Sequence, residues 1–376
     1  MPLTTTSLEL LRTAMGYGLI SAIVAFAWAP LLIKFLYKYQ LTRSPEYDAT
    51  LAMGGRKSKI GVPVMGGLLV IITVALATYL FNWERRFTWV PIGVMLLSAT
   101  LGGIDDVLHI YGHRRRSRKF KQVLTLIRVH RHWYMRLWYI FTLPWSIFKR
   151  LSVWLSRDPG KGIHVHEKLI LQFIAGAITA WWVYAKLGGD WLRVFVPFDG
   201  YVNIGIWIVA LIIFFVMFTA NAVNVADGMD GLAGGALLIT FAGLTLLSWL
   251  DGYQTVAILN ATVVGSLIAY TYFNIKPARF QMGDVGSLGL GALLAINLII
   301  INRMLLLPFF GFIFYLELAT VIIQVFSRHF LGRRVFTMAP IHHHFELRGW
   351  SEEKTVMRFW IIHAAFVLLG LWVALY

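Results

Sequence analysis

The sequence predicts an all-α integral membrane protein with ten transmembrane helices. Of its 376 residues, 58% are hydrophobic and only 14% are charged, and the mean hydropathy is +0.69. About a quarter of the residues in an average soluble domain are charged, so this composition excludes an ordinary soluble protein. Backbone groups in lipid must be hydrogen-bonded internally, and runs of roughly 20 apolar residues meet this condition as helices.

Ten apolar runs are long enough to be candidate spans. They cover residues 15–37, 61–81, 87–104, 167–187, 203–222, 232–250, 253–273, 286–302, 304–327 and 356–375. Only a short region around Arg303 separates the eighth run from the ninth. The first run is too long for a cleavable signal peptide, and no small-residue cleavage site follows it. We therefore expect a single polytopic membrane domain over residues 1–376.

The basic residues predict the orientation. The loops at 34–59, 105–168, 276–279 and 328–358 hold 28 of the 34 Lys and Arg residues. The opposite side holds Arg12, Arg85, Arg86, Lys186, Arg193 and Arg303. Because cytoplasmic loops are rich in Lys and Arg, both termini are expected on the periplasmic side of a bacterial inner membrane. The net charge of +16 then reflects topology and attraction to anionic membrane lipids, and we expect no nucleic-acid partner.

Residues 113–158 form a basic insertion with twelve Lys and Arg, interleaved with tryptophans. Residues 136–155 are apolar enough to suggest an eleventh span, but one more crossing would move every later basic loop to the outside. Pro144 and the basic ends of this stretch are typical of a helix or helical hairpin lying in the cytoplasmic interface. We expect the interfacial arrangement.

Five aspartates stand at the cytoplasmic ends of the predicted spans: Asp105, Asp106, Asp227, Asp230 and Asp284. Any one of them could cap a helix or pair with a nearby arginine. Five carboxylates on one rim would repel one another unless a cation or a cationic substrate group were present. The chain contains no cysteine, and oxygen ligands with a phosphate substrate favour Mg²⁺. Buried ionisable groups in membrane proteins indicate a functional site.

Two glycine-containing segments accompany these aspartates. From Asn221 to Asp230 a polar side chain recurs at every third position, and glycines follow both Asp227 and Asp230. Asp284 stands in a glycine turn that opens the next span, and a helix N-terminus suits phosphate. The third polar segment holds His342, His343 and His344 between Pro340 and Glu346. A histidine run alone is weak evidence, because such tracts more often bind metal or remain solvated.

In order along the chain, these motifs resemble those of the bacterial phospho-N-acetylmuramoyl-pentapeptide transferases, the translocase I branch of the polyprenyl-phosphate N-acetylhexosamine-1-phosphate transferases. Residues 59–67, KIGVPVMGG, resemble the family's KxGTPTMGG loop, and Asp105-Asp106 its aspartate pair. Residues 221–235, NAVNVADGMDGLAGG, resemble its nucleoside-binding loop, and residues 277–291 its third aspartate motif. Residues 339–350, APIHHHFELRGW, resemble the histidine loop in the form of this branch.

The resemblance implies Mg²⁺-dependent transfer of phospho-MurNAc-pentapeptide from UDP-MurNAc-pentapeptide to undecaprenyl phosphate, giving lipid I and UMP in peptidoglycan synthesis. It implies that Asp105, Asp106, Asp284 and the three histidines are catalytic: Asp105 positions or deprotonates the acceptor phosphate, Asp106 supports it, and the histidines engage phosphate or sugar groups. It places Asp284 and Asn221 at the metal. The implied substrate-binding residues are Lys59, Lys161, Asn221, Asn224, Asp227, Asp230, Asn274 and Gln281.

The resemblance leaves open a homodimer, and also whether transfer occurs in one step or through a covalent aspartyl intermediate. This chain departs from the family pattern at His109, where the family has lysine after its aspartate pair, and Lys161 or Lys168 could replace that cation. Gln281 precedes the MGD motif where the family usually has phenylalanine, with Phe280 one residue earlier. The competing predictions are a GlcNAc-1-phosphate transferase using UDP-GlcNAc and, in another class, a transporter or lipid-binding membrane protein.

Overall fold

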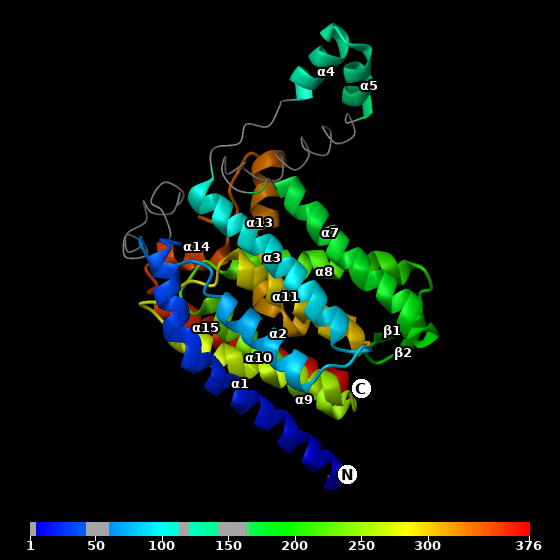
Figure 1. Cartoon of the computed structure of the whole chain (residues 1–376), viewed down its shortest axis with the longest axis vertical. Helices are drawn as coiled ribbons and strands as arrows, with labels where there is room; N and C mark the ends of the chain where they lie inside the picture. The colour runs from blue at the N-terminus through cyan, green and yellow to red at the C-terminus, as the bar shows by residue number, and fades with distance from the viewer. Residues whose placement is uncertain (1–4, 43–59, 113–119, 142–162, 164) are drawn as a thin grey trace.

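The computed structural model describes residues 5–42, 60–112, 120–141, 163 and 165–376, and these residues are mostly helical (Figure 1). The long helices are α1 (Thr5–Lys38), α3 (Trp89–Tyr111), α7 (Val165–Trp182, continued by a π-helical turn to Leu187), α8 (Trp207–Ala226), α9 (Leu232–Leu250), α10 (Gln254–Asn274), α11 (Gly283–Ile300), α13 (Phe312–Phe330) and α15 (Glu352–Ala374). The shorter ones are α2 (Leu68–Phe81), α4 (Phe120–Val129), α5 (Trp133–Phe141), α12 (Leu307–Phe310) and α14 (Ile341–Leu347).

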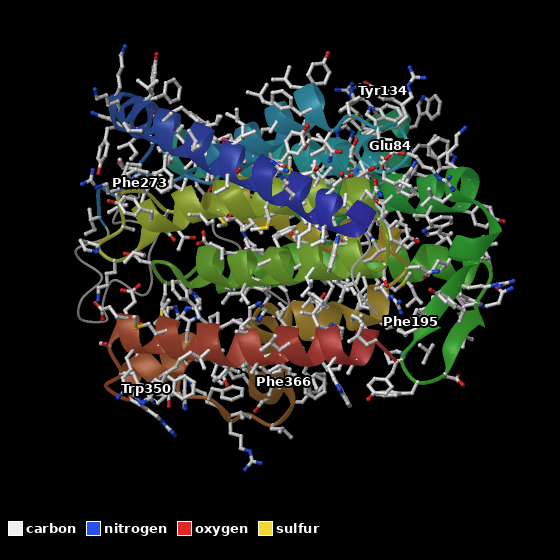
Figure 2. All side chains as sticks on the ribbon, turned by 90° about the horizontal axis from the view of Figure 1, so that it is seen from below. Glu84, Tyr134, Phe195, Phe273, Trp350 and Phe366 are labelled. Carbon is white, nitrogen blue, oxygen red and sulfur yellow. The ribbon has the colours of Figure 1, made fainter. Side chains whose placement is uncertain are left out.

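Helix α11 is the centre of the bundle. Every residue from Val285 to Ile300 is buried, and the helix packs against α3 and α8. Helix α10 packs against α1 and α9, and α9 packs against α15. Figure 2 shows α1 (blue) and α15 (red) on opposite sides of the bundle. A helix that is apolar on all sides is expected to be buried at the centre of a protein. The helices packed around it then end close to one another.

Nine helices in the described part of the chain are long and apolar enough to cross a membrane, so the chain is a multi-pass membrane protein. The remaining predicted span, 61–81, the second along the chain, is helical only over the 14 residues of α2. Such a helix is about 21 Å long, shorter than the roughly 30 Å of a hydrocarbon core. Residues 61–67 form a loop instead, because Gly66 and Gly67 donate backbone hydrogen bonds to the carbonyls of Gln281 and Met282 at 2.7 and 2.9 Å.

Other predicted boundaries are wrong as well: α1 begins at Thr5 and not near 15, and α13 begins at Phe312 and not near 304. Helix α3 continues to Tyr111, so Asp105 and Asp106 lie within the helix and not at its end. The predicted span 203–222 begins too early, because residues up to 203 belong to an antiparallel hairpin of β1 (Arg193–Val196) and β2 (Gly200–Asn203). The all-α prediction missed this hairpin. The break around Arg303 is confirmed: its guanidinium bonds both carboxylate oxygens of Asp251, at 2.9 and 3.1 Å.

The hairpin and the C-terminus lie at one end of the bundle, where the ring of Phe198 lies 5.6 Å from that of Tyr376. Helix α1 also begins at this end (Figure 1). Of the predicted insertion 113–158, only α4, α5 and their connection are described. These two short helices lie beyond the ends of α3 and α7, with Trp133 and Trp138 exposed. A helix reaching residue 155 falls outside the described residues, and the interfacial position stays a prediction.

Candidate active site

A lysine joins two of the predicted aspartates. Nζ of Lys168, in the first turn of α7, lies 2.6 Å from Oδ2 of Asp284 and also forms an ion pair with Asp105. The backbone N–H of Ile163 donates to Oδ1 of Asp105 at 2.6 Å. Asp105 is fully buried, whereas the side chains of Asp284 and Lys168 are 24% and 21% exposed. The Asp284–Lys168 pair is therefore the accessible part of the cluster, and Asp105 lies behind it.

His109 supports the same cluster from α3. Its Nδ1 lies 3.1 Å from the backbone oxygen of Asp105 and 3.4 Å from its Oδ2, as residues four apart on a helix allow. The family pattern has a lysine at this position, and Lys168, one of the two lysines expected to replace it, forms an ion pair with Asp105. The other, Lys161, and also Lys59, lie outside the described residues.

Asp106 caps the N-terminus of α11. Its two carboxylate oxygens accept hydrogen bonds from the backbone N–H groups of Asp284 and Val285, both at 3.1 Å. A carboxylate is favourable here because the first N–H groups of a helix have no internal partner. Asp106 therefore caps a helix, which is one of the alternatives that the sequence leaves open for each aspartate. By holding the backbone of Asp284, Asp106 fixes the direction of the carboxylate that follows.

The segment after α8 is tied to the same turn. Asp227 accepts a hydrogen bond from the N–H of Gly283 at 3.0 Å, and Asp230 accepts one from the N–H of Ala278 at 3.3 Å. All five aspartates therefore gather around the loop before α11, as predicted. Lys168 and backbone N–H groups relieve much of the expected repulsion.

Asn274 is almost fully buried behind this segment. Its Oδ1 accepts from the N–H of Gly231 at 2.9 Å, and its Nδ2 donates to the carbonyl of Phe280 at 2.8 Å. Both ends of the amide therefore hold backbone, which gives Asn274 a positioning role. Its predicted contact with substrate stays a prediction. Phe280 is also fully buried and lies 5.3 Å from the Tyr270 ring, so it lines the core and not a nucleotide pocket.

The two asparagines of α8 have different neighbours. Asn224 Nδ2 donates to Oδ1 of Asp284 at 2.7 Å and to the hydroxyl of Ser287 at 2.9 Å. Asn221, one turn earlier, pairs with Gln172 of α7, with 2.6 Å between Nδ2 and Oε1. Asn224 thus contacts Asp284 directly, whereas Asn221 forms its hydrogen bonds with Gln172 and the carbonyl of Met217. Gln172 lies four residues after Lys168, a spacing that could have identified it from the sequence.

The histidines form a linked row on α14. His342 and His343 are buried, with 3.1 Å between their Nε2 atoms, and Nδ1 of His343 lies 3.2 Å from Oε2 of Glu346. A Cβ on Gly228 would lie 2.4 Å from Nε2 of His342, so glycine is needed where this ring meets the α8–α9 segment. His344 is more exposed, and its Nδ1 accepts from the N–H of Thr337 at 3.2 Å.

His344 lies in the short helix α14 and Lys276 in the loop between α10 and α11, both outside the spans, and neighbouring groups shift their pKa values. Burial and the nearby Arg348 lower the pKa of His344, which favours the neutral ring. With Nδ1 accepting, the neutral ring carries its proton on Nε2 and can donate it. Burial opposes the charge of Lys276, but the hydrogen bond to Glu353 and the charge of Glu352 raise its pKa overall.

Glu317 is a site residue that the sequence argument missed. It is fully buried in α13, and its Oε2 lies 3.0 Å from Nδ1 of His342. An acidic residue within an apolar span is by itself a signal of function, and that signal was available in the sequence. Glu317 anchors the first histidine and turns its other nitrogen toward His343.

The donor chemistry suits a hard cation such as Mg²⁺. Carboxylate oxygens of Asp105 and Asp284 converge on the ammonium group of Lys168, so this position already holds positive charge. No group of three or more acidic or histidine side chains that could hold a metal occurs within the described ranges. Magnesium commonly uses one or two carboxylates and takes its remaining oxygens from water and substrate phosphate, which agrees with this set.

Comparisons with known proteins identify the family. The model of glycosyl transferase family 4 matches residues 155–302. A phospho-N-acetylmuramoyl-pentapeptide-transferase of Levilactobacillus brevis is 34% identical over 325 residues, which cover 85% of this chain and 86% of that protein. One from a Geobacillus species is 30% identical over 361 residues, covering 94% and 96%. The chain belongs to the phospho-N-acetylmuramoyl-pentapeptide-transferase family.

A similarly named transferase of Chloroflexus aurantiacus is 33% identical over 326 residues, 84% of this chain and 78% of that protein. The stretch matched by the glycosyl transferase family 4 model contains Asp284 and the two side chains that donate to it, Lys168 and Asn224. The histidine row lies beyond that stretch. In this member of the phospho-N-acetylmuramoyl-pentapeptide-transferase family, Lys168 and Asp284 of the charged cluster lie inside the matched stretch, whereas Asp105 and the histidine row lie outside it.

Proposed function

We propose that the protein transfers phospho-MurNAc-pentapeptide from UDP-MurNAc-pentapeptide to undecaprenyl phosphate, forming lipid I and releasing UMP. An oxygen of the acceptor phosphate attacks the phosphorus that carries the sugar, and the bond from that phosphorus to the oxygen bridging it to UMP breaks. One pyrophosphate linkage replaces another, and the electron pair of the broken bond leaves with UMP. The observation that carries the proposal is the Asp105–Lys168–Asp284 cluster in a chain with these relatives.

The exposed part of the cluster suits the reacting phosphates. Lys168 can neutralise phosphate oxygens, and Asp284, supported by Asn224 and by the backbone contact to Asp106, would hold Mg²⁺ with Asn221 nearby. The bound cation would reduce repulsion between the two anionic substrates. Asp105 would position or deprotonate the acceptor once Lys168 turns toward phosphate. The histidine row would engage phosphate or sugar groups at the far side of the α8–α9 segment.

An apolar cavity beside the cluster offers a path for the polyprenyl chain. It has a volume of about 540 Å³ and lies between α7, α8 and α13. Its walls include Leu169, Phe218 and Ile322, and Asn221 lies at its edge. Leu169 follows Lys168 directly, so a lipid in this cavity would carry its phosphate toward the charged cluster. Such a path lets a bilayer-soluble acceptor meet a water-soluble donor.

The orientation follows from the basic loops. We place the cluster on the cytoplasmic face of a bacterial inner membrane, because 28 of the 34 Lys and Arg residues lie in loops of this side. With α2 counted as a tenth, shortened crossing, both termini face the periplasm. A homodimer remains an expectation from the family.

The experiment that tests the function is UMP release by purified protein supplied with undecaprenyl phosphate and Mg²⁺. UDP-MurNAc-pentapeptide and UDP-GlcNAc are compared as donors, and Asp284→Asn serves as the inactive control. Release with the first donor alone supports the proposal. Release with UDP-GlcNAc alone would assign the protein to GlcNAc-1-phosphate transfer, and no release with either would favour a transporter or lipid-binding protein.

A further inference from the structure

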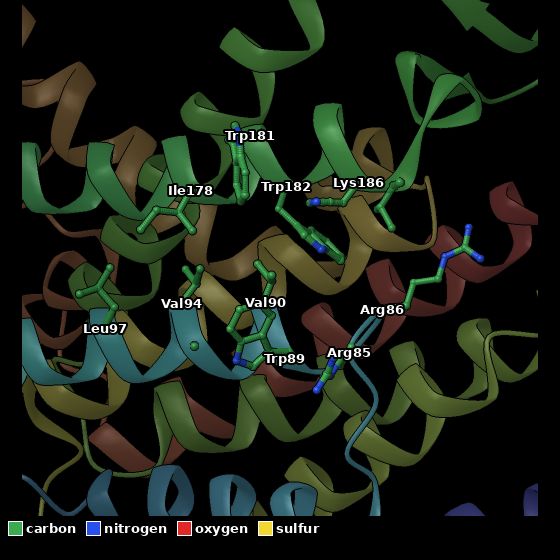
Figure 3. A pocket seen from close by; sticks show the side chains of 12 residues that line it. Arg85, Arg86, Trp89, Val90, Val94, Leu97, Ile178, Trp181, Trp182 and Lys186 are labelled. Carbon is green, nitrogen blue, oxygen red and sulfur yellow. The ribbon is translucent and has the colours of Figure 1, made fainter.

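A large cavity lies at the end of α3 and α7 that is remote from the charged cluster. It has a volume of about 680 Å³, and Figure 3 shows side chains from the two helices facing each other across it. Trp89, Val94 and Leu97 of α3 form one wall, and Ile178, Trp181 and Trp182 of α7 form the other. Trp89 and Asp105 are 16 residues apart on one helix, so the two sites are separated by about 24 Å.

Positive charge gathers at the mouth of this cavity. Arg85, Arg86 and Lys186 all line it, and they are three of only six Lys and Arg residues on this side of the molecule. In Figure 3, Lys186 extends beside Trp182. Arg86 turns outward, with its guanidinium 5.2 Å from the Phe87 ring centroid. No carboxylate among the side chains that the structure describes forms an ion pair with Arg85 or Lys186.

The combination points to one kind of ligand. A water-soluble anion would meet apolar walls, and a neutral apolar ligand would leave the cations without a function. An acyl chain can lie between the tryptophan-rich faces, while a phosphate group meets the cations at the mouth. Tryptophan and arginine are also the residues that membrane proteins place at the level of lipid headgroups.

We propose that the α3–α7 cavity binds an anionic glycerophospholipid, with one acyl chain between the helices and its phosphate beside Arg85 and Lys186. Charge complementarity identifies the occupant. Basic residues are scarce on the side of the molecule where the cavity opens, and Arg85 and Lys186 at its mouth form no ion pair with a described carboxylate. The site is independent of the transferase reaction, and it does not require the active site to be occupied. It gives α3 and α7, which carry Asp105 and Lys168 at their other ends, a lipid contact that holds them together.

The test measures lipid binding to the full-length purified protein. Phosphatidylglycerol and phosphatidylcholine with identical acyl chains are titrated, and bound lipid is counted by native mass spectrometry. Phosphatidylglycerol should bind more tightly to the wild type. The double substitution Arg85→Gln and Lys186→Gln should weaken its binding roughly 30-fold, since each cation near a lipid surface contributes about a factor of 5. Arg12→Gln, an exposed cation away from the cavity, should have no effect.

A second pair of variants tests the apolar part without changing charge. Gly93 lines the cavity, and a Cβ added there would meet no atom within 4 Å. Gly93→Leu should therefore fold and fill the acyl-chain space, whereas Gly93→Ala should leave it open. Phosphatidylglycerol should bind the leucine variant several-fold more weakly than the alanine variant.

Three results would overturn the proposal. The first is equal binding of the two lipids to the wild type, and the second is unchanged phosphatidylglycerol binding in the double variant or in Gly93→Leu. The third is efficient disulfide-linked dimer formation by Ile178→Cys in lipid nanodiscs, because the chain has no native cysteine and such a bond would mean that a second copy covers the cavity.

Discussion

The charged cluster around Lys168 and the histidine row on α14 hold their polar groups in different ways. In the cluster, two carboxylates share one ammonium group, and two of its members are partly open to solvent. In the histidine row, Glu317 and Glu346 flank His342 and His343, which are both buried. Only His344 is more exposed.

This difference indicates that the cluster and the histidine row have different roles. An exposed ion pair can exchange its partner for phosphate or Mg²⁺, because both alternatives satisfy the same charges. A buried chain of imidazoles and carboxylates cannot change partners without exposing unpaired polar groups, which is costly. We therefore assign the reacting phosphates to the cluster and a positioning role to His342 and His343. Changes in the cluster should then affect turnover more than changes in the row.

The largest effect is expected at the carboxylates of the cluster. Asp284→Asn and Asp105→Asn should each reduce kcat at least roughly 100-fold, the scale of losing a positioned electrostatic or acid–base group. UMP release under saturating substrate measures the effect. Asp199→Asn, an exposed aspartate in the hairpin turn, is the matched control and should retain wild-type turnover. Near-normal rates in both cluster variants, with the fold intact, would remove the active site from this position.

Asp106→Asn separates a reacting carboxylate from a capping one. Its two oxygens bond only backbone N–H groups in the described contacts, and an amide can keep one of them. Removing a helix cap costs about 1 kcal/mol, so the melting temperature should fall by a few degrees, alongside a loss of kcat smaller than in Asp284→Asn. A loss of kcat equal to that of Asp284→Asn with unchanged melting would place Asp106 among the reacting groups.

Lys168→Met should reduce kcat roughly 10- to 100-fold, because it leaves Asp105 and Asp284 without their shared counter-charge. Higher Mg²⁺ concentrations should recover part of the loss, since a divalent cation can supply the missing charge. Lys186→Met changes the same residue type at the other end of the helix and should leave UMP release unaffected. A Lys168→Met enzyme with wild-type kcat would show that the cation between the carboxylates is dispensable.

Glu317→Gln tests the histidine row and should reduce kcat roughly 10-fold. The amide fills the same volume but removes the carboxylate charge that lies 3.0 Å from Nδ1 of His342. Glu346→Gln, which acts on His343 from a partly exposed position, is the comparison and should have the smaller effect. If Glu317→Gln were as damaging as Asp284→Asn, the histidine row would take part in the reaction itself.

The smallest effect is expected at His109. His109→Lys brings in the residue of the family pattern, and the new ammonium group would lie beside Asp105, where Lys168 already provides positive charge. We expect kcat to change by less than about 3-fold at pH 7. Turnover measured from pH 6 to pH 8.5 provides the check, and a loss above 10-fold would mean that this chain depends on imidazole at this position.

Much of the site could be predicted because its residues carry a strong signal in an apolar chain. Asp105, Asp106, Asp227, Asp230 and Asp284 stand out by their charge, and the structure brings them together. Their roles could not be predicted, because the difference between Asp105 and Asp106 depends on which way each carboxylate points. That direction is set by packing of α3 on α11, where a Cβ on Gly102 would lie 2.1 Å from the Asp284 carbonyl oxygen.

Prediction of the fold from the sequence was limited in the same way. Hydrophobic run lengths predicted where the helices lie, since each run must be hydrogen-bonded internally to remain in lipid. They could not predict that residues 61–67 leave the helix, because that loop obtains its hydrogen bonds from Gln281 and Met282, distant in sequence. Glu317 carried a signal of its own, as an acidic residue within an apolar span, but its partner could not be predicted. His342 lies 25 residues away, and no local pattern joins the two.

The central claim is that the Asp105–Lys168–Asp284 cluster carries phosphosugar transfer from UDP-MurNAc-pentapeptide. The most direct measurement is the joint appearance of UMP and polyprenyl-linked MurNAc-pentapeptide in purified protein with Mg²⁺, undecaprenyl phosphate and the labelled donor. The account predicts equal amounts of the two products, their loss when EDTA removes the cation, and at least roughly 100-fold slower formation by Asp284→Asn. UMP without the lipid product, or full activity of Asp284→Asn, would contradict it.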